Sequence, residues 1–148
     1  MFVSSFLTPK SEVVWVSSTG TVEQALERMK PNGFSAVPIL DDDGFYVGTL
    51  STSDLMWFLL DTDRPWLERA RSSPLLRVQR RFHGSAVPID AEVGALVAYA
   101  LDQPFIPVVD EHERFVGIVR RRRLIEYCAS LAGVGLPSSL SEPKRKLA

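Results

Sequence analysis

Short apolar runs separated by turn residues form the clearest pattern in this chain. Residues 36–40 and 45–50 are two such runs, and the Asp- and Gly-containing segment 41–44 between them is typical of a β-hairpin turn. Residues 105–109 and 115–119 repeat this arrangement in the second half of the chain. The pattern therefore predicts two β-hairpins, one in each half.

The two predicted hairpins are copies of one motif. Pro38 is followed ten residues later by Gly48, and Pro107 is followed ten residues later by Gly117. The two copies lie 69 residues apart. Because there are only two copies, the repeat favours a paired module over a longer array of repeats.

Helical and extended patterns flank the first hairpin. Thr21 with Gln24 three positions later forms a capping box, which predicts a helix through about Met29 that the following Pro-Asn-Gly sequence ends. A β-branched and aromatic run at residues 13–16 predicts a strand before this helix. A cluster of N-capping residue types predicts a second helix over residues 53–60.

The second half repeats this order of elements. A predicted strand at residues 86–89 is followed by a helix that we expect Asp90 to cap and that runs to Leu101. A last helix is expected over residues 121–131. The predicted fold is therefore α/β (α+β), with two tandem β-α-β-β-α motifs packed as a pseudo-two-fold pair.

This interpretation divides the chain into five parts. We expect an N-terminal arm (1–12), a first motif (13–60), a basic connector (61–84), a second motif (85–131) and a flexible tail (132–148). The connector carries six arginines and is interrupted by prolines, which favours short helical turns over one long helix.

Composition limits the functions that are open to this chain. The formal net charge of −1 argues against a dedicated nucleic-acid binder. The charge is uneven, because residues 1–60 carry three Lys and Arg against seven Asp and Glu, whereas residues 61–148 carry fourteen against eleven. An anion is therefore expected to bind in the second part of the chain.

The single cysteine, Cys128, excludes an intramolecular disulfide and fits a reducing compartment, and its place on a predicted helix face indicates a packing residue. No apolar run approaches the roughly 18–20 residues that span a bilayer, and the N-terminus lacks the basic region of a signal peptide. We therefore expect a soluble cytoplasmic protein. His83 and His112 show no metal-like spacing, so no metal is predicted.

Ser51 and Asp54 stand at a predicted strand-to-helix junction. A hydroxyl and the unpaired N–H groups at a helix start suit a phosphate, and an Asp one turn later can accept hydrogen bonds from a ribose diol. The alternative interpretation is that both residues only cap the helix.

The second copy differs most at the same junction, where four consecutive arginines stand. Arg120 is the counterpart of Ser51, and Arg123 is the counterpart of Asp54. Planar guanidinium groups suit bidentate contacts to phosphate oxygens, and four positive charges at a helix start oppose the helix dipole. The arginines therefore indicate a phosphate site, and the alternative is a solvated basic face. Arg121 and Arg122 are the first choices, with Arg120 and Arg123 less firmly assigned.

The pattern Gly33-x-x-x-x-Pro38, the hairpin, and then Gly48-x-Leu50-Ser51-x-x-Asp54 resembles a cystathionine-β-synthase-type (CBS) motif. Residues 33–38, residues 102–106 and the arginines after Gly117 make the chain similar to the small bacterial CBS-pair proteins that bind cyclic di-AMP. The resemblance implies a flat homodimer with ligand clefts between the motifs. It also implies nucleotide contacts from Trp15, Ser35, Ala36, Val37, Pro38, Phe105 and Ile106. The alternative for Trp15 is a place in the core or at a dimer interface.

The leading hypothesis is a non-enzymatic regulatory module that binds an adenine nucleotide, with cyclic di-AMP first, and signals to a separate effector protein. The alternatives are an AMP, ADP or ATP energy-charge sensor, and a nucleic-acid or protein interaction module built on the arginines. We expect no cofactor beyond the nucleotide ligand. The sequence offers no nucleophile–base pair at a known spacing and no P-loop, which argues against an enzyme.

Overall fold

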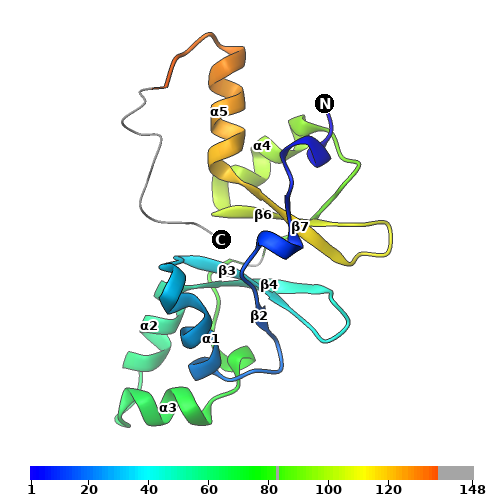
Figure 1. Ribbon diagram of the computed structural model, residues 1–148. Helices are drawn as coiled ribbons and strands as arrows, with labels where there is room; N and C mark the ends of the chain where they lie inside the picture. Colours follow the sequence, from blue (N-terminus) through cyan, green and yellow to red (C-terminus); the bar gives the residue numbers. More distant parts are fainter. Residues whose placement is uncertain (83, 137–148) are drawn as a thin grey trace.

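The computed structural model describes residues 1–82 and 84–136 of the 148-residue chain. His83 and residues 137–148 of the predicted tail lie outside the described residues. The two halves of the chain stack with their sheets facing each other in the middle and their helices on the outside (Figure 1). The predicted α/β pair of motifs is confirmed.

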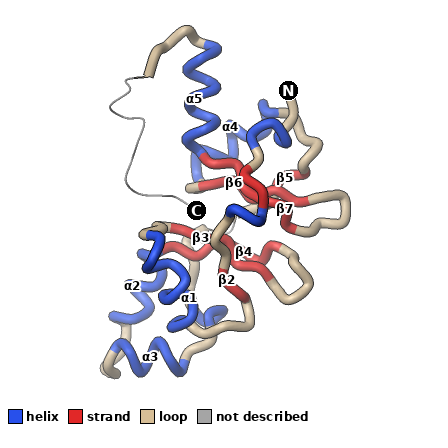
Figure 2. Tube along the Cα trace, in the orientation of Figure 1, coloured by secondary structure: helices blue, strands red, loops and turns tan. Residues whose placement is uncertain are grey.

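The first half contains a three-stranded sheet in the order β2-β3-β4. Strand β2 (Val16–Ser17) is parallel to β3 (Ala36–Leu40), and β3 forms the predicted hairpin with β4 (Tyr46–Ser51). Helix α1 (Val22–Met29) begins at the predicted capping box, and α2 (Thr52–Leu60) follows β4 directly. Both helices cover the outer face of this sheet, as Figure 2 shows, and their buried apolar residues belong to the core of the first half.

The second half repeats these elements. Strand β5 (Val87–Pro88) is parallel to β6 (Phe105–Val109), which forms a hairpin with β7 (Phe115–Arg120). Helices α4 (Val93–Asp102) and α5 (Arg121–Leu131) pack on the outer face of this sheet. Between the halves, the connector forms α3 (Trp66–Ser72) and a 3₁₀ turn, so the expected short helical turns are confirmed.

One of the two hydrophobic cores lies between the sheets and is shared by both halves. Phe105, Phe115 and Ile118 of the second sheet belong to the same buried cluster as the core residues of the first half. The Phe115 N–H donates a hydrogen bond of 2.9 Å to the Gly44 carbonyl, and an isolated β-bridge joins Phe45 to Arg114, its counterpart 69 residues later. A bridge between equivalent residues is what a pseudo-two-fold axis between the hairpins produces.

The segment that leads into each motif packs on the other motif. Strand β1 (Thr8–Pro9) pairs with β7, which makes the second sheet four-stranded. A Cβ added at Gly117 would lie 2.1 Å from the Thr8 carbonyl oxygen, so this close approach requires glycine. At the counterpart Gly48, an added Cβ would lie 3.0 Å from Nη1 of Arg80, which belongs to the segment before β5.

Three expectations were wrong in detail. Of the strand expected over residues 13–16, only Val16 is extended in a sheet, as the first residue of β2. Val13 instead ends a 3₁₀ turn, in which its N–H donates to the Lys10 carbonyl. Asp90 does not cap α4, which starts after Glu92, and the first N–H of the helix donates to the carbonyl of Met1. Cys128 is exposed on α5 rather than packed in the interior.

In the part of the chain that the structure describes, no helix combines the length and the apolar character needed to cross a bilayer.

Candidate functional site

Two strand-to-helix junctions occupy equivalent places in the two halves. Ser51 ends β4 and caps α2, and Arg120 ends β7 at the start of α5. Ala36 is the register partner of Ser51, and Phe105 is the register partner of Arg120. The repeat therefore places Ser51 and Arg120 at the same corner of their sheets, and only the chemistry of the two corners differs.

The first junction is closed by reciprocal hydrogen bonds. The Ser51 Oγ accepts from the Asp54 N–H at 3.2 Å, and the Asp54 Oδ2 accepts from the Ser51 N–H at 3.0 Å. The other carboxylate oxygen, Oδ1, accepts from the Arg81 N–H at 3.1 Å, and Asp54 is only 7% exposed. Capping accounts for both side chains without a ligand. Each carboxylate oxygen has room for a second hydrogen bond, so the ribose contact of Asp54 stays a prediction.

The base-facing edge predicted for the first motif is only partly accessible. Ser35 is exposed, and its carbonyl accepts a hydrogen bond of 2.9 Å from Thr52 at the start of α2. Ala36, Val37 and Pro38 are buried in β3. Ser35 is thus the member of this set that a ligand could reach in the present conformation.

The second junction carries buried donors that lack acceptors. The Nε atoms of Arg120 and Arg121 are both buried, and neither has a hydrogen-bond partner among the described residues. The Arg121 Nη2 donates to the Gln103 carbonyl, which orients this guanidinium. Arg120 occupies the N-cap position without capping the helix through its side chain. The geometry therefore points first to Arg120 and Arg121.

The other two arginines at this junction face outward. Arg122 forms an ion pair with Glu126 one turn later, with 2.8 Å between Nε and Oε1, and Arg123 is exposed. Phe105 is buried in the core between the two sheets, and Ile106 is buried in the separate core of the second half. Their side chains therefore present no surface to a ligand in this conformation.

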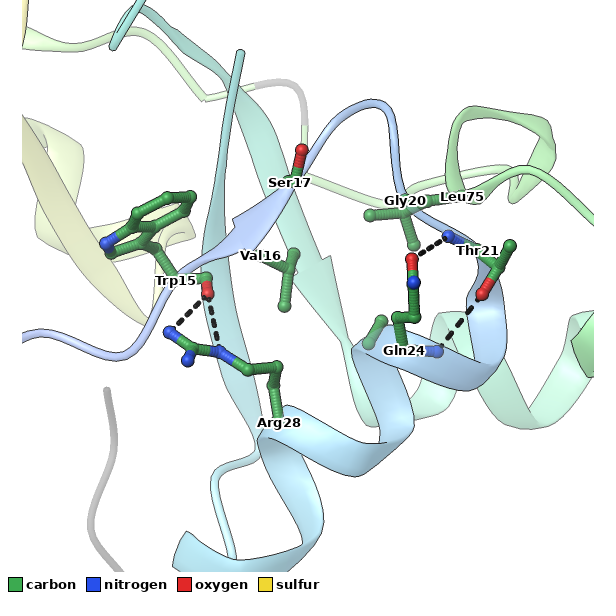
Figure 3. A pocket seen from close by; sticks show the side chains of 9 residues that line it. Trp15, Val16, Ser17, Gly20, Thr21, Gln24, Arg28 and Leu75 are labelled. Carbon is green, nitrogen blue, oxygen red and sulfur yellow. Dashed lines mark hydrogen bonds between the residues drawn. The ribbon is translucent and has the colours of Figure 1, made fainter. Parts of the chain in front are cut away.

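Trp15 lies in a basic setting on the first half. The Trp15 carbonyl accepts hydrogen bonds of 3.3 and 3.2 Å from Nε and Nη2 of Arg28, and the Lys10 Nζ lies 5.5 Å from the centre of the indole ring. An adjoining cavity of about 290 Å³ is mostly apolar. In Figure 3 Arg28 reaches from α1 to this carbonyl, and the capping box of Thr21 and Gln24 closes the opposite end. Among the described residues, no hydrogen bond joins Trp15 to either junction.

A larger cleft of about 780 Å³ lies between α2 and the connector, beside Asp54. Sequence reasoning did not assign it, although the six arginines of the connector were the available signal. Its lining residues are Asp54, Trp57, Phe58, Leu60, Asp61, Arg69, Arg77, Gln79, Arg80 and Arg81.

Tyr46 shows how the first sheet holds a polar group in its interior. Its hydroxyl and the Thr49 Oγ1 are 2.6 Å apart. Burial raises the pKa of Tyr46 above its ordinary value, and the hydrogen bond with Thr49 and the charge of Arg80 offset part of that rise.

A comparison with known proteins identifies the family to which this chain belongs. The family model described as CBS domain matches residues 3–61 and 71–130. No curated protein sequence matches the chain.

Three solved structures illustrate the likeness. A CBS domain-containing protein of unknown function from Bacillus anthracis str. Ames Ancestor is 25% identical, with a TM-score of 0.78 over 88% of this chain and 94% of that one. CbpB in complex with c-di-AMP is 26% identical, with a TM-score of 0.74 over 90% of this chain and 87% of that one. CBSX2 in complex with AMP, at 18% identity, a TM-score of 0.71 and coverage of 88% and 97%, shares the fold.

Proposed function

The chain belongs to the CBS domain family, and on that premise we propose that it is a non-enzymatic regulatory module. It binds an adenine nucleotide, with cyclic di-AMP as the first candidate, in the cleft between its two CBS motifs. Binding changes its affinity for a separate effector protein, because a ligand that prefers one conformation shifts the population toward it.

The observation that carries this proposal is the pair of buried guanidinium donors at the start of α5. Arg120 Nε and Arg121 Nε have no acceptor among the described residues. A buried N–H donor without an acceptor is costly, and two of them at one corner favour a bound anion. Phosphate oxygens suit guanidinium groups through paired, charge-assisted hydrogen bonds.

Cyclic di-AMP supplies two phosphates in one compact molecule, which suits two neighbouring arginines. The similarity to CbpB, whose structure holds c-di-AMP, supports the same choice. An AMP, ADP or ATP sensor is the second candidate, because Ser51 and Asp54 keep the residue types that suit a phosphate and a ribose at the first junction. The arginines make this second candidate less favourable.

The same proposal includes a homodimer. Helix α2 exposes Met56, Trp57 and Leu60, and α5 exposes Ile125, the counterpart of Met56. An apolar groove of about 410 Å³ lies between α1 and α2. Exposed apolar side chains at equivalent places in both halves favour a partner with the same pseudo-symmetry, which a second copy of the chain provides.

Isothermal titration of the full chain with cyclic di-AMP, AMP, ADP and ATP tests the ligand. We expect cyclic di-AMP to bind most tightly, and Arg120→Ala and Arg121→Ala each to weaken it more than Arg122→Ala does. The matched control is Arg64→Ala, which removes one exposed positive charge from the connector. Failure of all four nucleotides to bind at high micromolar protein would overturn the proposal.

A further inference from the structure

The N-terminal arm is anchored in the second half of the molecule, although it precedes the first half in sequence. Val3 is 0% exposed and Phe6 is 7% exposed, and both belong to the core of the second half. The Val3 N–H donates to the Ala91 carbonyl at 2.9 Å, and the Val93 N–H donates to the Met1 carbonyl at 3.1 Å. In Figure 1 this part of the chain lies beside α4 and crosses β7 before it reaches the first half. The arm is therefore an ordered part of the second half.

One contact of the arm is with the strand that leads to Arg120. Strand β1 pairs antiparallel with β7, and Thr8 lies opposite Ile118. Because the pairing is antiparallel, the arm residues before Thr8 run toward the end of β7, where Arg120 stands. A Cβ added at Gly117 would lie 2.9 Å from Cδ1 of Leu7, so the side chain of Leu7 also packs on this strand. The arm therefore fixes the last part of β7.

The other contact of the arm is with the helix that carries Arg121. The ring of Phe6 packs edge-on against Tyr127 of α5, with 5.0 Å between the ring centres. Leu124, one turn before Tyr127 on α5, is buried in the same core as Phe6. Arg120, Leu124 and Tyr127 recur at helical spacing, so Arg120 begins the side of α5 that faces the arm.

The arm thus contacts both elements that meet at the anion corner, which is the corner formed by Arg120 and Arg121. The positions of their buried Nε donors depend on how β7 and α5 are held relative to each other. Hydrogen bonds weaken steeply when distance and angle depart from the preferred values. A small shift between β7 and α5 is therefore enough to change the contact with a phosphate.

We propose that the N-terminal arm positions the anion corner, and that Phe6 is its positioning residue. The docked arm holds β7 and α5 in the arrangement that binds phosphate, and release of the arm lowers the affinity of the corner. This inference rests on the proposed function, because it concerns the same ligand at the same corner. It adds a means of regulation, since an event that displaces the arm from the second half also releases the nucleotide.

Titration of the full chain with cyclic di-AMP tests this role. We expect Phe6→Ala to weaken binding about fivefold or more, which is the lower range of coupling between separate groups. Phe6→Leu should retain most of the affinity, because an apolar side chain of similar volume keeps the packing. Leu75→Ala is the matched control, since it removes a buried side chain from the other core and should leave the affinity unchanged. Circular dichroism verifies that each variant is folded.

Hydrogen exchange of the wild type tests the same coupling without a substitution. If the docked arm favours ligand binding, the ligand must favour the docked arm by the same factor. Cyclic di-AMP should therefore slow exchange at the amides of Val3 and Val93, which join the arm to the second half. The slowing should be smaller at the amide of Leu75, which donates to the Gly20 carbonyl in the first half.

Three outcomes would overturn the proposal, and they can be told apart. Equal affinity of folded Phe6→Ala and the wild type would remove the positioning role and leave the proposed ligand in place. Equal slowing of exchange at Val3, Val93 and Leu75 would show that the ligand stabilises the whole fold without acting on the arm. If cyclic di-AMP does not bind the wild type, the proposed ligand and this role both fail.

Discussion

The backbone N–H of Arg81 donates its hydrogen bond to the carboxylate of Asp54, so the segment that leads into the second motif is tied to a helix start in the first. The same carboxylate closes the capping box with Ser51. Asp54 therefore holds two parts of the fold together before any ligand is considered.

Replacing Asp54 tests whether this residue is structural or binds the ligand. Asp54→Ala removes the capping box and the tie to Arg81, so we expect the ligand-free protein to lose about 1–3 kcal/mol of unfolding free energy. Urea unfolding measures this loss, and Asp63→Ala, an exposed carboxylate in the connector, should change stability by less than about 0.5 kcal/mol. Unchanged stability with lost nucleotide affinity would instead make Asp54 a binding residue only.

Arg120→Ser should separate stability from binding. The serine places a hydroxyl at the N-cap of α5, which typically adds about 0.5–2 kcal/mol to the free energy of unfolding. The substitution also removes the buried Nε, which has no acceptor among the described residues. We therefore expect the melting temperature to rise while the affinity for cyclic di-AMP falls about tenfold or more. A variant with lower stability and unchanged affinity would contradict the phosphate role of Arg120.

Gly117→Ala tests the crossing of β1 over β7. The added Cβ would lie 2.1 Å from the Thr8 carbonyl oxygen, which is backbone and must shift, so we expect a loss of about 1–3 kcal/mol in unfolding free energy. Gly94→Ala is the matched control. Gly94 lies in α4 with no atom within 4 Å of an added Cβ, and alanine should stabilise the helix by up to about 1 kcal/mol. Equal stability of the two variants would mean that β1 does not hold this position in solution.

The hairpins, most helices and the pairing of the two halves were predictable from sequence because local patterns specify them. The limits of β3, β6 and α5 agree with the prediction to the residue. For the two strands the reason is that an apolar run between turn residues has one register that buries its side chains. The start of α4 was not predictable, because its N–H group is satisfied by the Met1 carbonyl, about ninety residues away in sequence.

The candidate site was predictable only in part, for a similar reason. The arginines of α5 are visible as a run in the sequence, but which of them carry buried donors depends on the Gln103 carbonyl and on Glu126. The cleft beside α2 depends on where α3 and the connector fold back, and no local pattern specifies that position.

Met56→Glu tests the proposed homodimer. Met56 is 47% exposed on α2 and lines the apolar groove between α1 and α2, so a charge there should disfavour a dimer formed through this face. We expect sedimentation to show a shift from dimer to monomer, with helical content unchanged. Leu76→Glu, an exposed apolar residue of the connector, should remain dimeric. A monomeric wild type would contradict the homodimer directly.

Tyr46 should make the protein sensitive to alkaline pH. Its pKa is raised above 10.0 by burial, so the folded state keeps the phenol proton at a pH where the unfolded chain has lost it. The resulting stability is fully present below about pH 10 and is lost as the pH rises through the higher folded pKa. Urea unfolding between pH 8 and 11 should therefore show a smaller alkaline loss in Tyr46→Phe than in the wild type.

Tyr127→Phe is the control for this pH profile, because the Tyr127 ring packs edge-on against Phe6 at a different place in the fold. If the unfolding free energy falls equally with rising pH in the wild type and in Tyr46→Phe, Tyr46 does not contribute to the alkaline loss of stability.

The pairing of β1 with β7 has a consequence for how the molecule folds. The second copy is not complete as a continuous stretch of chain, because its sheet takes its edge strand from residues that precede the first copy. Folding must join segments more than one hundred residues apart, and such distant contacts slow folding. The two copies are therefore expected to fold as one unit, and deletion of the residues before the first copy should destabilise the second sheet.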